Sequence, residues 1–273
     1  MLDLQEFIKI NLKLDMSKLK ISAIQMDVVW ENPEENIRNI NSYVFSHPGA
    51  DLYVLPEMFN TGFIDNVTEF GETIEGKSIT DLKEISRISS AAICGSIVLK
   101  ENDKYFNACV FVKPDGSVSV YKKRHLFKYG GEGEMFSRGN ERIIVDYLGW
   151  RIILMVCYDL RFPVWSRNCD DYDIIVYVSN WPEVRRNIFD VLLRARAIEN
   201  QAYLISCNRI GEDGKKIKYN GGTCIFNYKG EEMSKAKENE LEIVNAELDL
   251  DELLAFRKKF PAQSDRESFE IIL

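Results

Sequence analysis

A cysteine marks the end of a predicted buried strand. The predicted strand 150–156, which contains the apolar run 152–154, stops at Cys157, and Tyr158 and Asp159 follow. Strand ends and the loops after them commonly carry ligands and catalytic groups, and a thiol placed there could act as a nucleophile. Free cysteine also packs as a small apolar side chain, and most buried thiols are inert. Whether Cys157 can react therefore depends on a base and a cation from elsewhere in the chain.

Histidine is the commonest base for a thiol nucleophile, and the chain has two histidines. His47 stands in a Pro-Gly turn, where we expect it to be solvated. His125 lies among Lys123, Arg124 and Lys128, and this cluster of cations gives little support to a Cys-His dyad. The dyad remains an alternative.

A carboxylate held against apolar neighbours can replace histidine as a base. Glu57 is the candidate, because it follows the predicted buried strand 51–55 and is followed by two apolar residues. Lys122 and Lys123 stand where the predicted strand 118–122 ends. An acid and a lysine facing water would be the simpler interpretation of these residues. However, an acid, a cation and a thiol each stand at the end of a strand, and this coincidence favours a catalytic role for them.

The elements that must position these groups alternate between strands and helices. A helix is expected from Pro33, with Asn32 as its cap and two acids in its first turn, and apolar residues at helical spacing predict another over 184–200. Further helices are expected at 79–89, 161–167 and 250–258, and strands at 19–25, 51–55, 93–99, 105–112, 118–122, 141–147, 150–156, 174–179, 202–208, 222–228 and 241–248. Because hairpins interrupt the α/β alternation, we expect a mixed sheet or two stacked sheets with helices outside.

The composition is that of a globular protein. A length of 273 residues suits one large α/β domain. A net charge of -8 argues against partners such as nucleic acid or an anionic membrane, and no apolar run approaches the roughly 20 residues of a membrane span. The first residues lack a signal-peptide layout, so we expect a cytoplasmic protein with an N-terminal extension over 1–17 and a single domain over 18–273.

The six cysteines show no Cys-x-x-Cys pair and no regular spacing. Several of them fall inside apolar, strand-like runs. We therefore expect reduced thiols, with neither a disulfide framework nor a metal site.

Three segments of the chain resemble the signature segments of the nitrilase superfamily of carbon-nitrogen hydrolases. They are 55–59 (Leu-Pro-Glu-Met-Phe), 121–127 (Tyr-Lys-Lys-Arg-His-Leu-Phe) and 157–163 (Cys-Tyr-Asp-Leu-Arg-Phe-Pro), in the order that the family has them. The resemblance implies a four-layer α-β-β-α sandwich with two stacked mixed sheets, an assembly of at least two chains, and no cofactor.

The resemblance also implies a Glu-Lys-Cys triad. By position in the motifs, Glu57 is the general base, Lys123 the cation and Cys157 the nucleophile. Family members often need a second glutamate, for which Glu132 and Glu134 compete. Counting back from the glycine at position 139 favours Glu132, and the alternative is a solvated acidic loop.

Within the superfamily, the segments 157–168, 180–182 and 195–203 are similar to those of bacterial ω-amidases. Such enzymes hydrolyse the terminal amide of 2-oxo acid monoamides such as 2-oxoglutaramate and 2-oxosuccinamate, through a cysteine thioester. Their substrates are anionic, so the pocket should offer a cation, and arginine binds carboxylates in a bidentate fork. The substrate contacts implied in this way are Phe63, His125, Tyr158 (through its backbone N–H), Arg161, Asn180, Trp181 and Arg185.

Two other functions remain open. One is an amidase of the same family that acts on deaminated glutathione or on an N-carbamoyl compound. The other is an inactive scaffold with the nitrilase fold. The presence of Glu57, Lys123 and Cys157 together argues against the scaffold.

Overall fold

The computed structural model describes residues 17–272. Two six-stranded sheets and one two-stranded ribbon make up its β-structure. The first sheet has the order β14 (Glu242–Asp249), β1 (Lys18–Gln25), β2 (Leu52–Val54), β3 (Ala92–Glu101), β4 (Lys104–Val112), β5 (Val118–Lys122). The second has the order β13 (Glu232–Lys235), β12 (Cys224–Phe226), β9 (Tyr203–Asn208), β8 (Ile174–Ser179), β7 (Trp150–Val156), β6 (Ile144–Tyr147).

Both sheets are mixed. Strands β1, β2 and β3 run parallel to one another, as do β7, β8 and β9, whereas the outer strands pair antiparallel. Successive side chains of a strand point to opposite faces, so Leu52 and Val54 face the second sheet while Tyr53 faces the helices. One apolar core between the sheets therefore joins the two halves.

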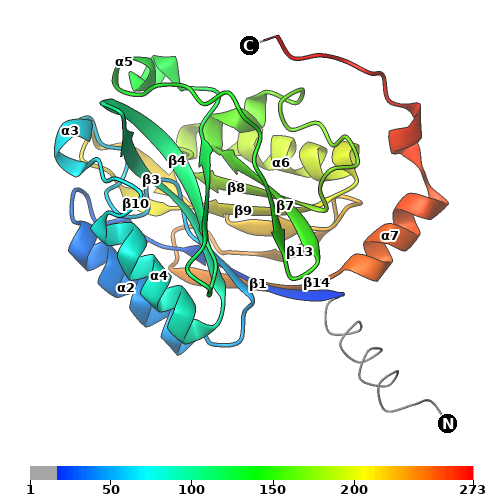
Figure 1. Cartoon of the computed structure of the whole chain (residues 1–273), viewed down its shortest axis with the longest axis horizontal. Coiled ribbons are helices and arrows are strands. Elements are labelled where there is room, and N and C mark those ends of the chain that lie inside the picture. The colour runs from blue at the N-terminus through cyan, green and yellow to red at the C-terminus, as the bar shows by residue number, and fades with distance from the viewer. Residues whose placement is uncertain (1–16, 273) are drawn as a thin grey trace.

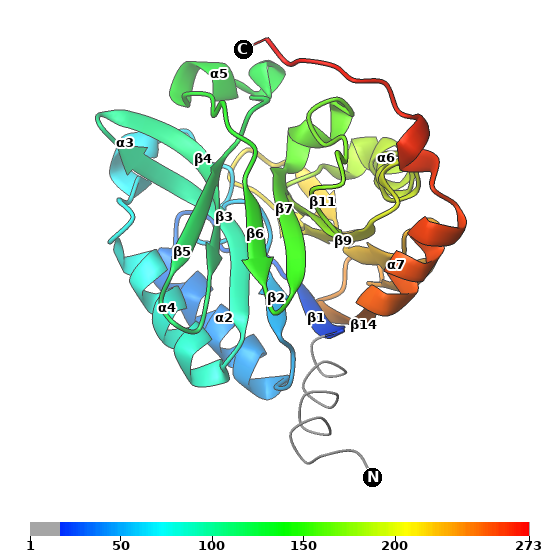
Figure 2. The ribbon, with the colours of Figure 1, turned by 45° about the vertical axis from the view of Figure 1, so that its right-hand side comes forward.

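Helices cover the outer faces of the two sheets (Figures 1 and 2). The helices α2 (Pro33–Ser46) and α4 (Lys77–Ser89) bury Ile40, Val44, Ile79 and Leu82 against the first sheet. Helix α6 (Arg186–Asn200) packs on the second sheet, and α7 (Leu250–Lys259) continues from β14. The structure thus confirms the predicted α-β-β-α sandwich.

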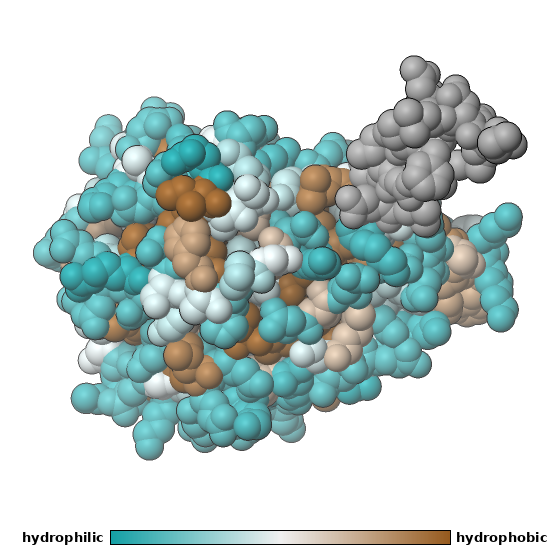
Figure 3. Space-filling view, turned by 90° about the horizontal axis from the view of Figure 1, so that it is seen from below, coloured by the Kyte–Doolittle hydropathy of each residue, from teal (hydrophilic) through white to brown (hydrophobic). Residues whose placement is uncertain are grey.

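The outward side of the α2–α4 layer is mainly polar. Seen from below, apolar side chains appear as separate groups among hydrophilic ones (Figure 3). Within the described residues, no helix has the length and apolar character needed to cross a membrane. The predicted extension, 1–17, lies outside the described residues apart from Ser17.

The sequence prediction was wrong in a few elements. No helix spans 161–167: a 3₁₀ helix, η2, covers Cys157–Arg161 and turns follow it. The reason is Pro163, which disfavours helical geometry at Phe162. The predicted strand 222–228 is reduced to β12, because Gly221 and Gly222 adopt positive φ angles before it. The short strands β10 (Ile210–Glu212), β11 (Lys218–Asn220) and β13 were not predicted.

Candidate active site

The ends of three strands bring an acid, a lysine and a cysteine together. Glu57 follows β2, Lys123 follows β5, and Cys157 follows β7. All three are buried, and Cys157 retains 9% exposure. Segments from both sheets therefore meet at one end of the sandwich.

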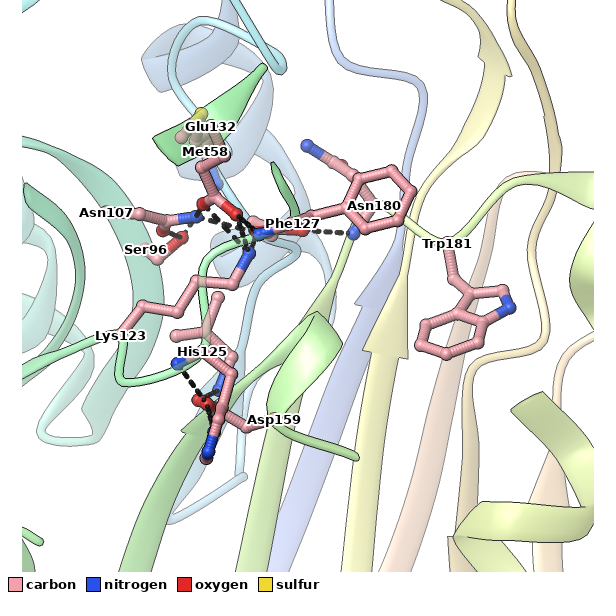
Figure 4. A network of polar contacts seen from close by, with 12 residues as sticks. Met58, Ser96, Asn107, Lys123, His125, Phe127, Glu132, Asp159, Asn180 and Trp181 are labelled. Atoms are coloured by element: carbon pink, nitrogen blue, oxygen red, sulfur yellow. Dashed lines mark hydrogen bonds and ion pairs between the residues drawn. The ribbon is translucent and has the colours of Figure 1, made fainter. Parts of the chain in front are cut away.

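Lys123 lies between two carboxylates. Its ammonium donates to Glu57 Oε1 at 2.9 Å. It also donates to both oxygens of Glu132 at 2.9 Å, and Figure 4 shows Lys123 and Glu132 side by side. Glu132 is fully buried, in the one-turn helix α5 (Glu132–Met135), and its Oε2 also accepts the backbone N–H of Phe127 at 2.5 Å. Glu134 is exposed. Of the two competing glutamates, the structure therefore places Glu132 beside the lysine.

Asn107 was missed by the sequence reasoning. Its side-chain N–H₂ donates to Glu57 Oε1 at 2.7 Å and to Glu132 Oε1 at 2.9 Å, and its Oδ1 accepts from Ser96 at 3.0 Å. Ser96 in turn accepts the backbone N–H of Met58 at 2.9 Å. An Asn in the middle of the apolar strand 105–112 was the available signal, because a buried amide needs hydrogen-bond partners.

Burial and charge set the protonation of this group. Burial alone would lower the pKa of Lys123, but Glu132 and Glu57 outweigh it and raise that pKa above its ordinary value. Burial raises the pKa of Glu132, against the opposing effect of Lys123. For the Cys157 thiol, burial and then the charge of Glu57 raise the pKa well above its ordinary value, while Lys123 lowers it. The resting site therefore holds a charged lysine and a protonated thiol.

Cys157 sits in a strained turn. Its φ of 43° is uncommon for a residue with a side chain. Asp159 supports the turn, since its Oδ2 accepts the N–H of Val156 at 3.0 Å and the hydroxyl of Tyr121 at 2.7 Å. Its Oδ1 accepts the N–H of His125 at 2.9 Å and lies 2.8 Å from that residue's Nδ1. Asp159 thus ties the segment that carries Lys123 to the turn that carries the thiol.

The same contacts keep His125 out of the pocket that lies beside Cys157. Its ring stacks on Phe162, with the ring centroids 3.8 Å apart, and it does not line the cavity at the thiol. The structure therefore supports neither the Cys-His dyad nor the predicted substrate contact of His125. It assigns this side chain to the Asp159 network (Figure 4).

A cavity of about 120 Å³ opens beside the thiol. The other predicted substrate contacts line it, namely Phe63, Tyr158, Arg161, Asn180, Trp181 and Arg185. Residues that were not predicted also line it, among them Phe127, Lys215, Ile217 and Tyr219. Phe127 is the last residue of the signature segment 121–127, but the others come from the β10–β11 ribbon and its turn, which the sequence reasoning missed.

The two arginines of the cavity are held by aromatic rings. The guanidinium of Arg161 lies 5.2 Å from the ring centre of Trp181, and that of Arg185 lies 5.1 Å from Phe127. Neither pairs with an acid of the part of the chain that the structure describes, and Asp159 has other partners. Both charges therefore remain available to an anionic ligand.

Asn180 offers a further polar group. Its backbone N–H donates to Glu57 Oε2 at 2.7 Å. The two polar atoms of its side chain are buried and find no hydrogen-bond partner among residues 17–272. A buried amide without a partner at a cavity wall is available to a bound ligand.

We expect Glu57→Gln to separate thiol ionisation from turnover. Removing the charge of Glu57 leaves Lys123 to lower the pKa of Cys157, so the thiolate should form at lower pH than in the wild type. Hydrolysis should nevertheless be lost, because the base is gone. The measurement is the pH profile of Cys157 alkylation by iodoacetamide, beside amide turnover. A midpoint at higher pH in the variant would contradict the arrangement of charges.

Comparison with known proteins identifies the family of this chain. The family model for carbon-nitrogen hydrolases matches residues 20–258. The chain belongs to the carbon-nitrogen hydrolase family, and within it is an amidase.

Among its relatives is the omega-amidase YafV of Yersinia enterocolitica, which is 42% identical over 94% of this chain and 100% of its own length. A 2-oxoglutaramate amidase of Bacillus subtilis is 30% identical over 91% of this chain and 97% of its own. The crystal structure of a CN-hydrolase superfamily protein from Xanthomonas campestris matches with a TM-score of 0.90 and 34% identity, covering 93% of this chain and 99% of that one.

Proposed function

We propose that this protein hydrolyses the terminal amide of small ω-amides of 2-oxo dicarboxylic acids, such as 2-oxoglutaramate and 2-oxosuccinamate, to the acid and ammonia. The observation that carries the proposal is a pair of arginines, Arg161 and Arg185, that have no acidic partner among residues 17–272 and line the cavity that holds Cys157. Two relatives, an omega-amidase and a 2-oxoglutaramate amidase, support the same substrate class.

The proposed reaction begins with proton transfer from Cys157 to Glu57 as the sulfur attacks the amide carbon. The oxyanion that forms is stabilised by Lys123 and by the N–H of Tyr158, which lies in the first turn of η2, where N–H groups lack partners within the helix. Glu57 then gives the proton to the leaving nitrogen, ammonia departs, and a thioester remains.

Water completes the proposed cycle. Glu57 takes a proton from the water as its oxygen attacks the thioester carbon, and the thiol is re-formed with that proton when the acid is released. Through both halves Lys123 stays charged, because the carboxylate of Glu132 lies beside it, and Asn107 holds Glu57 and Glu132 in place. The side-chain amide of Asn180, whose nitrogen and oxygen both lack a partner among residues 17–272, can hold the substrate beside the thiol.

The arginines are proposed to bind the far end of the substrate. A guanidinium matches a carboxylate through two parallel hydrogen bonds, and stacking on Trp181 or Phe127 orients it beforehand. The substrate is thereby placed with its anionic end on the arginines and its amide at the sulfur. A small cavity suits such a molecule better than the larger deaminated glutathione.

Arg161→Met and Arg185→Met are each expected to raise KM for 2-oxoglutaramate about tenfold, since a charge-assisted hydrogen bond is worth roughly 1.5–3 kcal/mol. The change in kcat should be smaller. Steady-state kinetics of ammonia release measures both constants. Arg194→Met is the matched control, because Arg194 also stacks on a ring, that of Phe226 at 5.1 Å, but does not line the cavity. Equal effects in all three variants would argue against carboxylate binding.

The substrate class is tested by an ammonia-release screen. We expect 2-oxoglutaramate and 2-oxosuccinamate to be turned over with a higher kcat/KM than deaminated glutathione, N-carbamoyl compounds or nitriles. Preference for deaminated glutathione or a carbamoyl compound would displace the proposal in favour of that activity. No turnover of any of these compounds would favour the inactive scaffold.

A further inference from the structure

A third cation stands at the rim of the cavity. Lys215 lies in the turn between β10 and β11 and lines the cavity together with Phe63. Its ammonium is 5.9 Å from the ring centre of Phe63 and donates to Asp65 Oδ1 at 2.5 Å. This ion pair joins the β10–β11 ribbon to the segment that leads into α3 (Val67–Phe70).

The turn that carries Lys215 is firmly built. The buried carboxylate of Asp213 accepts the N–H groups of Lys215 at 2.8 Å and Ile217 at 3.0 Å, and the hydroxyl of Tyr219 at 2.9 Å. Ile217 and Tyr219 themselves line the cavity. The backbone of Lys215 is therefore fixed at the rim, while its side chain, 34% exposed, can change partner.

Its partner is held far less firmly. The side chain of Asp65 is 62% exposed, and its carboxylate contacts no other side chain in the described structure than that of Lys215. An exposed ion pair of this kind contributes little net stability. A carboxylate brought into the cavity could therefore replace Asp65 as the partner of Lys215 at small cost.

We propose that Lys215 is a specificity-determining residue, which exchanges Asp65 for the anionic 2-oxo acid end of the substrate when the amide is at Cys157. The inference rests on the proposed function and extends it. Asp65 competes with the substrate for the ammonium, and the cavity prefers anionic over neutral amides. Lys215, Arg161 and Arg185 together would offer hydrogen-bond donors to the carboxylate of the substrate and to its neighbouring oxo group.

The competition predicts opposite effects for the two partners. Lys215→Met should raise KM for 2-oxoglutaramate about fivefold, whereas Asp65→Asn should lower it about twofold, in keeping with the modest energies of exposed charge pairs. Neither variant should change KM for the neutral methyl ester of 2-oxoglutaramate by more than about twofold. The values of kcat should stay close to that of the wild type.

The chain supplies a matched control in Lys216. This neighbouring lysine is on the same turn and pairs with Glu212 at 3.0 Å, but its side chain is 83% exposed and does not line the cavity. Lys216→Met should leave both substrates unaffected. Thermal melting of all the variants, measured beside the kinetics, reports whether a change in KM accompanies a loss of folding.

The outcomes separate the inference from the function on which it rests. Changes of opposite sign in Lys215→Met and Asp65→Asn, confined to the anionic substrate, support the exchange. An increase in KM in both variants, or an equal effect on the methyl ester, would mean that the ion pair only holds the two loops together, and would overturn it. If the wild type turned over no ω-amide, the proposed function itself would fail.

Discussion

Replacing Cys157 by alanine is expected to reduce ammonia release from 2-oxoglutaramate by more than about 10³-fold, as is typical when a covalent nucleophile is removed. Without the sulfur no thioester can form, and Glu57 and Lys123 would have only water to activate. The fold should persist, because alanine removes one atom at a site that already opens to a cavity. Turnover and thermal melting of the variant check both expectations.

A matched control comes from Cys169, which is exposed and lies away from the cavity. Cys169→Ser should keep full activity. In that background iodoacetamide should label Cys157 and abolish turnover in parallel, because Cys157 lines the cavity whereas the four other cysteines are buried away from it. Undiminished hydrolysis by Cys157→Ala, or inactivation without labelling of Cys157, would rule out the thioester route.

The pattern of the sequence predicted the sandwich because its signals are local. Apolar runs of strand length and the helical spacing over 184–200 reflect burial, and burial is what stabilises these elements in the structure. The strand-end positions of Glu57, Lys123 and Cys157 were also visible. Their meeting at one end of the sandwich came from the resemblance, since no local signal states which strand ends are neighbours.

The missed residues have a common physical cause. Asn107 looks like an interruption of an apolar strand until both Glu57 and Glu132 are placed beside it. Lys215 looks like a solvated turn lysine, because the short β10–β11 ribbon that carries it to the cavity has too few residues for a clear alternation. The role of such side chains depends on contacts between segments far apart in the chain.

Phe162 shows the converse case, in which a local signal was misjudged. Polar and apolar residues over 161–167 suggested a helix, yet the proline at 163 ends the 3₁₀ helix that starts at Cys157. The early end leaves Arg161 in the last turn of η2, where its guanidinium reaches Trp181. The error in secondary structure therefore concerned the segment that positions a proposed substrate contact.

Lys123→Met should be the most destabilising of the substitutions considered. It would leave Glu57 and Glu132 buried, sharing the amide of Asn107 with no cation between them. Removing one partner of a buried ion group typically costs about 3–5 kcal/mol of unfolding free energy. Amide turnover should fall below detection, because the oxyanion would lose its cation and the thiol its nearest positive charge.

The adjacent residue provides the control, since Lys122 is partly exposed and pairs with Glu101 at the surface. Lys122→Met should change the free energy of unfolding by less than about 1 kcal/mol. Denaturant unfolding of the wild type, Lys123→Met and Lys122→Met measures these changes in the free energy of unfolding.

The free energy of unfolding that is lost in Lys123→Met should become smaller as the pH falls. Lys123 opposes the rise in the pKa of Glu132 that burial causes, so without it that pKa should be higher still. A folded state with a raised carboxyl pKa binds more protons than the unfolded state, and its stability therefore rises as pH falls towards the ordinary range of glutamate. We expect the difference in the free energy of unfolding between Lys123→Met and the wild type to decrease from pH 8 to pH 5. Adding Glu132→Gln to Lys123→Met should restore part of the stability at pH 8 without restoring turnover. A difference in the free energy of unfolding that increases on acidification would contradict the charge arrangement.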